Sequence, residues 1–267
     1  MTQAFLGHRR LGHTVVAMGS LAMLVSACAS SARTAALGSA GADKFLFDQG
    51  TAALMDKKWI TAHDDFTRLL DSYPQSPFRA DAKLGVGDSY LGQNTVESLV
   101  LATNEYREFL SFYPTNARAD YAQFQLAMVH FKRMLAPQRD QTETREAVRE
   151  FETFVERYPN SDLMPEARSR LREAQDRLGD WELGVGITYL RMRWYPGAVE
   201  RFKGLLQTDP GYTHRDALYF NLAEALLQSE KTAEALPYYE RLLQEFEKSE
   251  YLEKARRRTE ELKTKPG

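Results

Sequence analysis

The stretch AVREFETFVERYP, residues 147–159, contains the spacing that decides the fold: an alanine, an aromatic residue four positions later, and a proline eight positions after that. This spacing puts the alanine and the aromatic residue on one face of a helix. The proline ends that helix, because the residue before a proline is pushed out of the helical conformation. The chain repeats the pattern as Ala62/Phe66/Pro74, Ala102/Tyr106/Pro114, Ala147/Phe151/Pro159 and Ala198/Phe202/Pro210, and a fifth copy, Ala235/Tyr239/Glu247, lacks the proline.

A second helix is predicted upstream of each copy. Each carries a small residue with a larger one three positions later: Gly50/Ala53, Gly87/Tyr90, Ala127/His130, Gly186/Tyr189 and Ala223/Leu226. A small residue at a helix crossing lets the partner helix approach closely. The combined pattern resembles the tetratricopeptide repeat, Gly-x2-Tyr, Ala-x3-Phe, Pro. The resemblance implies an all-α fold, a right-handed helical solenoid of about five tetratricopeptide-like helix pairs plus a C-terminal capping helix, which residues 249–258 would begin.

The spacing between copies locates insertions. The alanine-to-alanine steps are 40, 45, 51 and 37 residues, whereas the tetratricopeptide period is 34. Extra residues fall around 92–95 and in a polar inter-helix loop at 137–142. The step of 51 predicts one lengthened helix from about 165 to 193, with Pro165 in its first turn.

The N-terminus has the layout of a signal peptide, a basic start followed by an apolar stretch over 15–25. Leu24-Val25-Ser26-Ala27-Cys28 then resembles a bacterial lipobox. We therefore predict a lipoprotein signal peptide over 1–27, covalent diacylglycerol and N-acyl lipid (palmitate) on Cys28, and a lipidated flexible tether over 28–42. By analogy with other lipoproteins, Ala29 favours sorting to the outer membrane. Ordinary cleavage to a periplasmic protein and an uncleaved anchor remain alternatives.

Composition and motifs argue against several functions. The formal net charge of −2 disfavours binding nucleic acid through bulk charge, and a single cysteine excludes an internal disulfide framework. The sequence has no Gly-x4-Gly-Lys-Ser/Thr, Gly-x-Ser-x-Gly or His-Glu-x2-His motif. His63, His130 and His214 fall in different repeats without i, i+4 histidine partners, and His130 is interpreted as a packed residue. We expect no enzyme activity, no metal and no cofactor apart from the lipid.

Three stretches sharpen the resemblance: residues 154–161, residues 174–189 and residues 198–202. With the lipobox, they resemble the BamD (ComL/YfiO) family of lipoproteins in the outer-membrane β-barrel assembly machinery. The resemblance implies that residues 43–135 receive unfolded outer-membrane proteins. It implies that residues 136–262 dock a periplasmic domain of the β-barrel insertase subunit, beside other assembly-machine lipoproteins, and that 263–267 are a tail. The protein would be held at the periplasmic face of the outer membrane by its lipid.

The same resemblance suggests contact residues. Arg201 matches an arginine of the family pattern and would serve the insertase side; a structural surface arginine is the alternative. The candidates for binding extended, aromatic-ended substrates are Trp59, Phe78 and Tyr90, with Phe45 and Phe47 beside them. Core packing is the alternative for each aromatic residue. The competing function is another periplasmic scaffold lipoprotein with these repeats, serving pilus, cell-division or envelope polysaccharide assembly.

Overall fold

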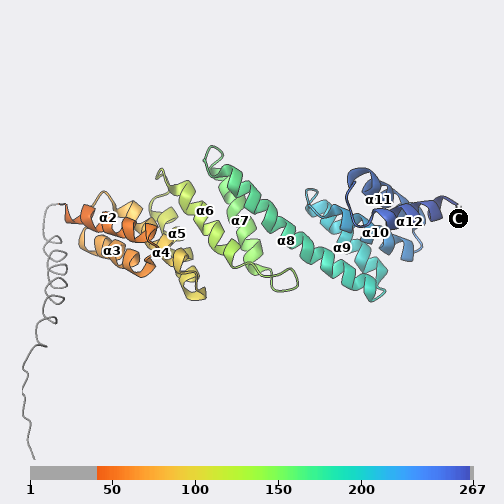
Figure 1. Cartoon of the computed structure of the whole chain (residues 1–267), viewed down its shortest axis with the longest axis horizontal. Coiled ribbons are helices and arrows are strands. Elements are labelled where there is room, and N and C mark those ends of the chain that lie inside the picture. The colour runs from red at the N-terminus through yellow and green to blue at the C-terminus, as the bar shows by residue number, and fades with distance from the viewer. Residues whose placement is uncertain (1–40, 265–267) are drawn as a thin grey trace, which may run out of the picture. The chain divides into compact units, whose positions relative to one another are not determined.

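The computed structural model describes residues 41–264, and within them all regular structure is helical (Figure 1). The predicted all-α repeat fold is confirmed: consecutive helices form five pairs, and a last helix follows. The helices are α2 (Ala42–Met55), α3 (Trp59–Ser72), α4 (Arg79–Gln93), α5 (Val96–Phe112), α6 (Ala119–Lys132), α7 (Thr142–Arg157), α8 (Met164–Arg191), α9 (Tyr195–Thr208), α10 (Arg215–Gln228), α11 (Thr232–Glu245) and α12 (Leu252–Thr264). The predictions for the signal peptide, Cys28 and most of the tether lie outside the described residues.

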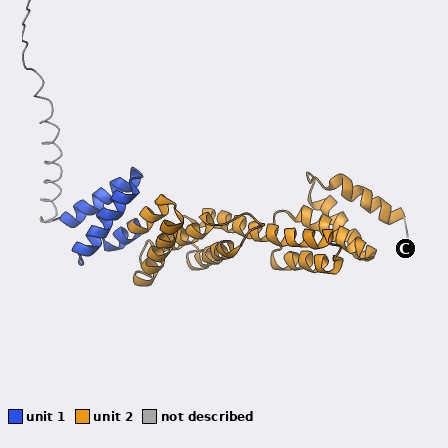
Figure 2. Cartoon of the chain, turned by 90° about the horizontal axis from the view of Figure 1, so that it is seen from below, with its two compact units in different colours: residues 1–85 blue, residues 86–267 orange. Residues whose placement is uncertain are grey.

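The described residues divide into two compact units inside α4 (Figure 2). The first unit ends at Gly85 and the second begins at Val86. The boundary expected at residues 135/136 separates the region that would bind substrates from the region that would bind the insertase. The compact units do not test it, and it stays a prediction. Two of its outer limits shift slightly: α2 begins at Ala42, and α12 continues to Thr264, past the expected start of the tail.

The first unit is built around Phe66, which is 1% exposed. Its ring lies against Gly50 of α2 and Gly85 of α4. A Cβ added to Gly50 would stand 2.8 Å from the ring, and one added to Gly85 would overlap it. The two glycines therefore make room for the aromatic side chain of α3 between its neighbouring helices.

The second unit repeats this packing. A Cβ on Gly87 would lie 2.9 Å from the ring of Tyr106, and one on Gly186 would overlap the ring of Phe202. The alanines and aromatic residues of all five copies are at most 1% exposed: Ala62, Phe66, Ala102, Tyr106, Ala147, Phe151, Ala198, Phe202, Ala235 and Tyr239. The spacing read from the sequence thus marks the core.

The second helix of each pair ends in the same way. Tyr73, Tyr113, Tyr158 and Asp209 precede the repeat prolines, with φ between −126° and −136° and ψ between 50° and 79°. These angles lie outside the helical region, as expected before a proline. Phe246 has φ −133° and ψ 79° although Glu247 follows it, so the fifth copy reaches this geometry without a proline.

Two of the three insertions lie where the spacing predicted them. The lengthened helix is α8, which has 28 residues and Pro165 in its first turn. The polar loop joins α6 to α7 over residues 133–141, and Thr142, expected in that loop, is already the first residue of α7. The third prediction, extra residues between the helices around 92–95, is wrong: Gly92 and Gln93 belong to α4, and only residues 94 and 95 join it to α5, which is lengthened to 17 residues instead. Thr95 and Ser98 form a reciprocal capping box that starts α5 at once.

The C-terminal helix α12 closes the last repeat. It buries Ala255 and Thr259 and leaves most of its charged side chains exposed. Arg258 Nε lies 2.9 Å from Glu224 Oε1, and the same oxygen accepts a 2.6 Å hydrogen bond from the hydroxyl of Tyr239. The polar capping helix predicted from the sequence is therefore confirmed, with an arginine that fixes it to α10.

A polar contact inside the second unit joins three helices. Asp88 Oδ1 accepts hydrogen bonds from the hydroxyls of Tyr106 (2.7 Å) and Tyr121 (2.9 Å). Desolvation raises the pKa of the Asp88 carboxyl above its ordinary value, and the two hydroxyls only partly oppose it. The tyrosines on α5 and α6 thus share one acceptor on α4.

Replacing Gly186 by alanine should lower the free energy of unfolding by about 2 kcal/mol, because the new methyl group overlaps buried Phe202. Gly184→Ala is the matched control: Gly184 lies in the same helix, and its added Cβ meets nothing within 4 Å. It should gain roughly 0.5–1 kcal/mol from helix propensity. Urea unfolding followed by circular dichroism measures both, and stabilisation by both substitutions would contradict the close packing.

Asp88→Asn should keep both hydrogen bonds, since an amide oxygen can replace Oδ1, and Asp88→Ala should cost about 2 kcal/mol by leaving the buried Tyr106 hydroxyl unpaired. The raised pKa means that folded Asp88 binds more protons than unfolded Asp88, so its contribution to stability falls as pH rises. As pH rises from 3 to 7, the free energy of unfolding of the asparagine variant should therefore increase relative to that of the wild type, as measured in paired denaturation curves. Equal losses for Asn and Ala would refute this account.

Candidate partner-binding site

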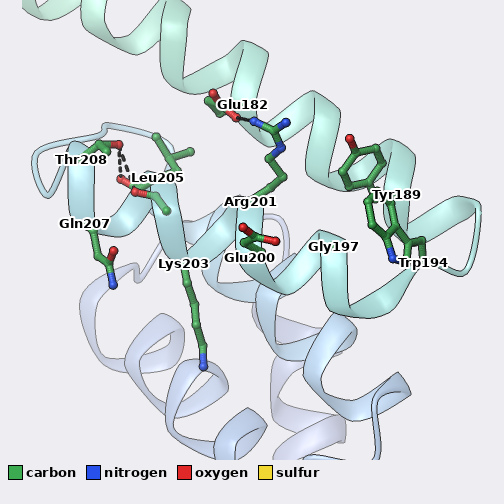
Figure 3. A pocket seen from close by; sticks show the side chains of 11 residues that line it. Glu182, Tyr189, Trp194, Gly197, Glu200, Arg201, Lys203, Leu205, Gln207 and Thr208 are labelled. Atoms are coloured by element: carbon green, nitrogen blue, oxygen red, sulfur yellow. Dashed lines mark hydrogen bonds and ion pairs between the residues drawn. The ribbon is translucent and has the colours of Figure 1, made fainter.

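A groove of about 640 Å³ lies along α8 and α9 in the second unit (Figure 3). Its walls combine aromatic rings with charged side chains of both signs. The lining residues are Glu182, Tyr189, Trp194, Gly197, Glu200, Arg201, Lys203, Gly204, Leu205, Gln207 and Thr208. None of them is a histidine or a cysteine, and the mixture suits binding of a polypeptide surface better than nucleophilic chemistry.

The turn between the two helices sets the aromatic end of the groove. Arg193 has a positive φ of 61°, and the Trp194 amide donates to the Tyr189 carbonyl oxygen at 2.9 Å, which closes α8. The indole of Trp194 lies 4.5 Å from the Tyr189 ring between centroids, and the residue is 56% exposed. Gly197 permits this position, because a Cβ there would stand 2.8 Å from the indole. A large aromatic residue is thereby held at the surface.

Arg201 projects from α9 toward α8 (Figure 3). Its Nη1 lies 3.2 Å from Glu182 Oε2, and its guanidinium carbon lies 5.9 Å from the Tyr189 ring centroid. The side-chain hydrogen bond to Tyr189 and, after it, the charge of Glu182 raise the pKa of Arg201. The side chain is still 42% exposed. Arg201 is thus an oriented cation, with room for a partner's carboxylate.

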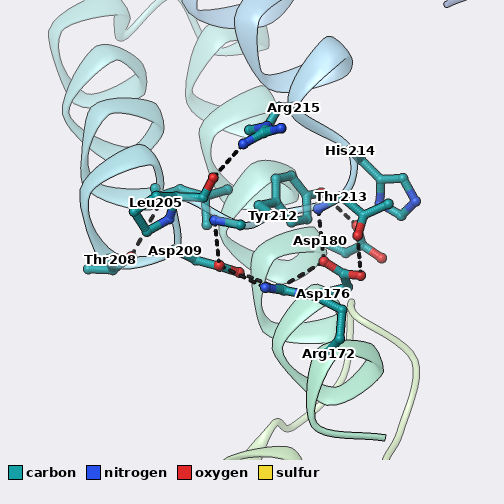
Figure 4. A network of polar contacts seen from close by, with 12 residues as sticks. Arg172, Asp176, Asp180, Leu205, Thr208, Asp209, Tyr212, Thr213, His214 and Arg215 are labelled. Carbon is teal, nitrogen blue, oxygen red and sulfur yellow. Dashed lines mark hydrogen bonds and ion pairs between the residues drawn. The ribbon is translucent and has the colours of Figure 1, made fainter. Parts of the chain in front are cut away.

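A polar network fixes the loop after α9 to the same long helix (Figure 4). Both Nη atoms of Arg172 contact the carboxylate of Asp209, with Nη1 3.0 Å from Oδ1, and Nη2 lies 2.9 Å from Asp176. Asp176 also accepts from the Thr213 amide at 2.9 Å and from its hydroxyl at 2.6 Å. The two-pronged arginine contact holds the start of the loop at Asp209, and Asp176 holds its end at Thr213.

The third carboxylate of the network binds two rings. Asp180 Oδ1 accepts a 2.6 Å hydrogen bond from the Tyr212 hydroxyl and lies 2.9 Å from His214 Nδ1. Tyr212 is fully buried over Gly179, and burial, followed by the hydrogen bond to Asp180, raises its pKa. Sequence analysis missed this network, although Arg172, Asp176 and Asp180 stand four residues apart on one helix face.

The predicted contact residues are spread over both units. Arg201 lines the groove of the second unit. Tyr90 is half-buried on α4 of the same unit, outside that groove. In the first unit, Phe78 stacks on Phe47 with centroids 5.0 Å apart, and Phe47 also meets Phe66 at 6.0 Å. The core alternative therefore fits Phe47 and Phe78. Trp59 and Phe45 are half-buried at the start of α3 and on α2, and the roles of all these residues stay predictions.

The structure also gathers residues that sequence analysis did not connect. Three side chains each place one possible metal-ligand atom within 4.8 Å of the other two: those of His130, Glu146 and Glu150. His130 has no second histidine one turn away in the sequence, and its neighbours are carboxylates on the next helix. The sequence feature that could have indicated this group is the i, i+4 spacing of Glu146 and Glu150, which places both on one helix face.

Among the described residues, no helix combines the length and apolar character that crossing a bilayer requires.

The five helix pairs, each with a buried alanine and a buried aromatic residue four positions apart, define a tetratricopeptide-repeat protein. A tetratricopeptide-repeat model accordingly matches residues 216–249, which include α11 and all of α10 except its first residue. A second family model, YfiO, described as an outer membrane lipoprotein, matches residues 39–227. The chain belongs to this outer membrane lipoprotein family.

Relatives of known description agree with the family. The chain is 28% identical over 185 residues to the outer membrane protein assembly factor BamD of Caulobacter vibrioides, a match that takes in 69% of this chain and 59% of that protein. It therefore spans about three fifths of that relative's length. The BamD protein of Vibrio cholerae is 25% identical over 175 residues, covering 62% of this chain and 71% of that one.

Solved structures give weaker likenesses. The TPR2AB-domain:pHSP90-complex of yeast Sti1 is 10% identical, covers 83% of each chain and has a TM-score of 0.45. At that TM-score we draw nothing from it.

Proposed function

We propose that this protein is a non-enzymatic scaffold of outer-membrane protein assembly, which binds the periplasmic domain of a β-barrel insertase and unfolded outer-membrane proteins to promote their insertion. The observation that carries the proposal is the YfiO family match over residues 39–227. The relatives named as outer membrane protein assembly factors support it. A surface groove with aromatic and charged walls is consistent with such a role.

The proposal includes a lipid anchor at the periplasmic face of the outer membrane. The family is described as an outer membrane lipoprotein, and Cys28 follows a lipobox-like stretch. Cys28 would carry the diacylglycerol and N-acyl chains; more than one acyl chain is needed for stable attachment. No other cofactor is part of the proposal.

The insertase would dock on the second unit at the groove along α8 and α9. Trp194 offers an exposed apolar surface beside Arg201, which is charged and already oriented by Glu182 and Tyr189. Aromatic residues and arginine contribute most to protein interfaces when they stand together in this way. The fitting partner surface carries a carboxylate next to an apolar residue.

Affinity capture from solubilised envelopes, with the protein tagged after Gly267, tests the assignment. The expected result is recovery of a large outer-membrane β-barrel protein with soluble repeat domains. Recovery of only pilus, cell-division or polysaccharide-assembly proteins would replace the proposal by the competing scaffold function.

Arg201→Glu should reduce capture of the insertase at least tenfold, because it reverses the charge that faces a partner carboxylate. Its thermal unfolding should stay close to that of the wild type, since an exposed ion pair adds little stability. Arg68→Glu, at an exposed arginine of the first unit, is the matched charge reversal and should capture the insertase normally. Equal capture by both variants would remove Arg201 from the interface.

Substrate segments would bind the first unit near the turn between α2 and α3. Met55 and Ile60 are 79% and 70% exposed there, and Ile60 follows Trp59 directly. Apolar side chains at this turn suit the aromatic-ended, extended segments of unfolded outer-membrane proteins. Tyr90 and Phe78 remain candidate contacts from the sequence.

Ile60→Ser should lower crosslinking of a synthetic C-terminal outer-membrane-protein peptide several-fold without loss of fold, because Ile60 is mostly solvent-exposed. Trp59→Ala should act in the same direction. Met192→Ser, at a residue 73% exposed in the second unit, is the matched control and should leave crosslinking unchanged. Loss of crosslinking in the control alone would move the substrate surface to the second unit.

A further inference from the structure

Three side chains from two helices converge at the start of the polar loop in the second unit. His130 stands near the end of α6, and Glu146 and Glu150 stand one turn apart on α7. One ligand atom of each lies within 4.8 Å of the others, the one such group among residues 41–264. His130 is 5% exposed, and the side chain of Glu150 is 12% exposed. The group therefore sits in the seam between α6 and α7.

The histidine is held in one tautomer. Its Nδ1 lies 2.8 Å from Glu143 Oε2, and an ionised carboxylate only accepts hydrogen bonds, so Nδ1 carries the proton. Arg133 holds the other oxygen of Glu143 at 2.7 Å and fixes that carboxylate in turn. A neutral ring protonated at Nδ1 presents a lone pair at Nε2.

That remaining nitrogen is buried and has no hydrogen-bond partner. Were the ring protonated at both nitrogens, Nε2 would carry a hydrogen with no acceptor within bonding distance, which a buried donor pays for in stability. A lone pair on buried Nε2, in a side chain that stands beside the carboxylates of Glu146 and Glu150, instead places three electron-rich groups together. A cation between them resolves both difficulties.

Glu150 is positioned from behind. Gln123, 2% exposed, donates its amide to Glu150 Oε2 at 2.8 Å and to the Glu150 carbonyl oxygen at 3.0 Å. Arg149 contacts Glu146 and lies 3.3 Å from Glu150 Oε1, and Arg107 lies 3.9 Å from the same atom. The Arg149 side chain is 59% exposed, so it has room to turn into solvent when a cation takes its place.

We propose that His130, Glu146 and Glu150 bind a divalent transition-metal cation, zinc first among them, which bridges α6 and α7. One imidazole nitrogen with carboxylate oxygens is a zinc ligand set, and magnesium and calcium prefer oxygen ligands alone. Glu143 supplies the carboxylate that typically orients a metal-binding histidine through its other nitrogen. The bridged helices are joined by residues 133–141, the longest connection between described helices, where a cross-link restricts the chain most. This inference is independent of the proposed function.

Zinc chloride titrated into the full chain, purified with a tag that contains no histidine and stripped with chelator, tests the proposal by calorimetry. We expect one zinc ion bound per chain, a rise in thermal midpoint on binding, and at least hundredfold weaker binding of magnesium. Glu146→Gln should weaken zinc binding at least tenfold and Glu143→Gln by about 10- to 100-fold. Arg149→Gln should strengthen it, because a competing cation is removed.

Glu156→Gln, at an exposed glutamate of α7, is the matched control and should bind zinc as the wild type does. Glu146 is 29% exposed at its side chain, so its variant should keep the fold even where His130→Gln does not. Cobalt bound in place of zinc should give visible absorption in the wild type that loses intensity in Glu146→Gln. Absence of zinc binding, or zinc binding unchanged in Glu146→Gln, would overturn the site.

Discussion

The fold depends on one repeated contact, an aromatic ring lodged against a helix that has no side chain at that point. Phe66 occupies the space left by Gly50 and Gly85, and Phe202 occupies the space left by Gly186. Any larger residue would push the helices apart and open the core, which is packed to the density of a crystal. The caps, the capping helix and the polar networks act on helices whose separation this contact has already set.

The sequence carried most of the fold because its signals are local. An alanine and an aromatic residue four apart define a helix face, and the proline that follows marks the helix end to within a residue. The length of α8 followed from spacing alone. Phe246 shows where the rule is incomplete: its helix ends with the same angles before Glu247, so packing as well as proline fixes that geometry.

The candidate sites were harder to predict because their members come from different helices. Arg201 was found through a family resemblance, but the exposed Trp194 beside it depends on the turn geometry and on Gly197. Asp88 meets Tyr106 and Tyr121 from 18 and 33 residues away. Sequence spacing does not predict such contacts, because they depend on how one helix pair packs against the next.

The long helix α8 changes how the second unit responds to stress. In an ordinary repeat array each pair contacts only its neighbours, and segments can unravel one at a time. Here the single uninterrupted helix α8 packs against both α7 and α9. Its residues Arg172 and Asp180 also bind the loop that follows α9. Unfolding of the whole of α8 removes support from both flanking repeats, so the two repeats should unfold together, and a partner that stabilises one of them should also stabilise the other.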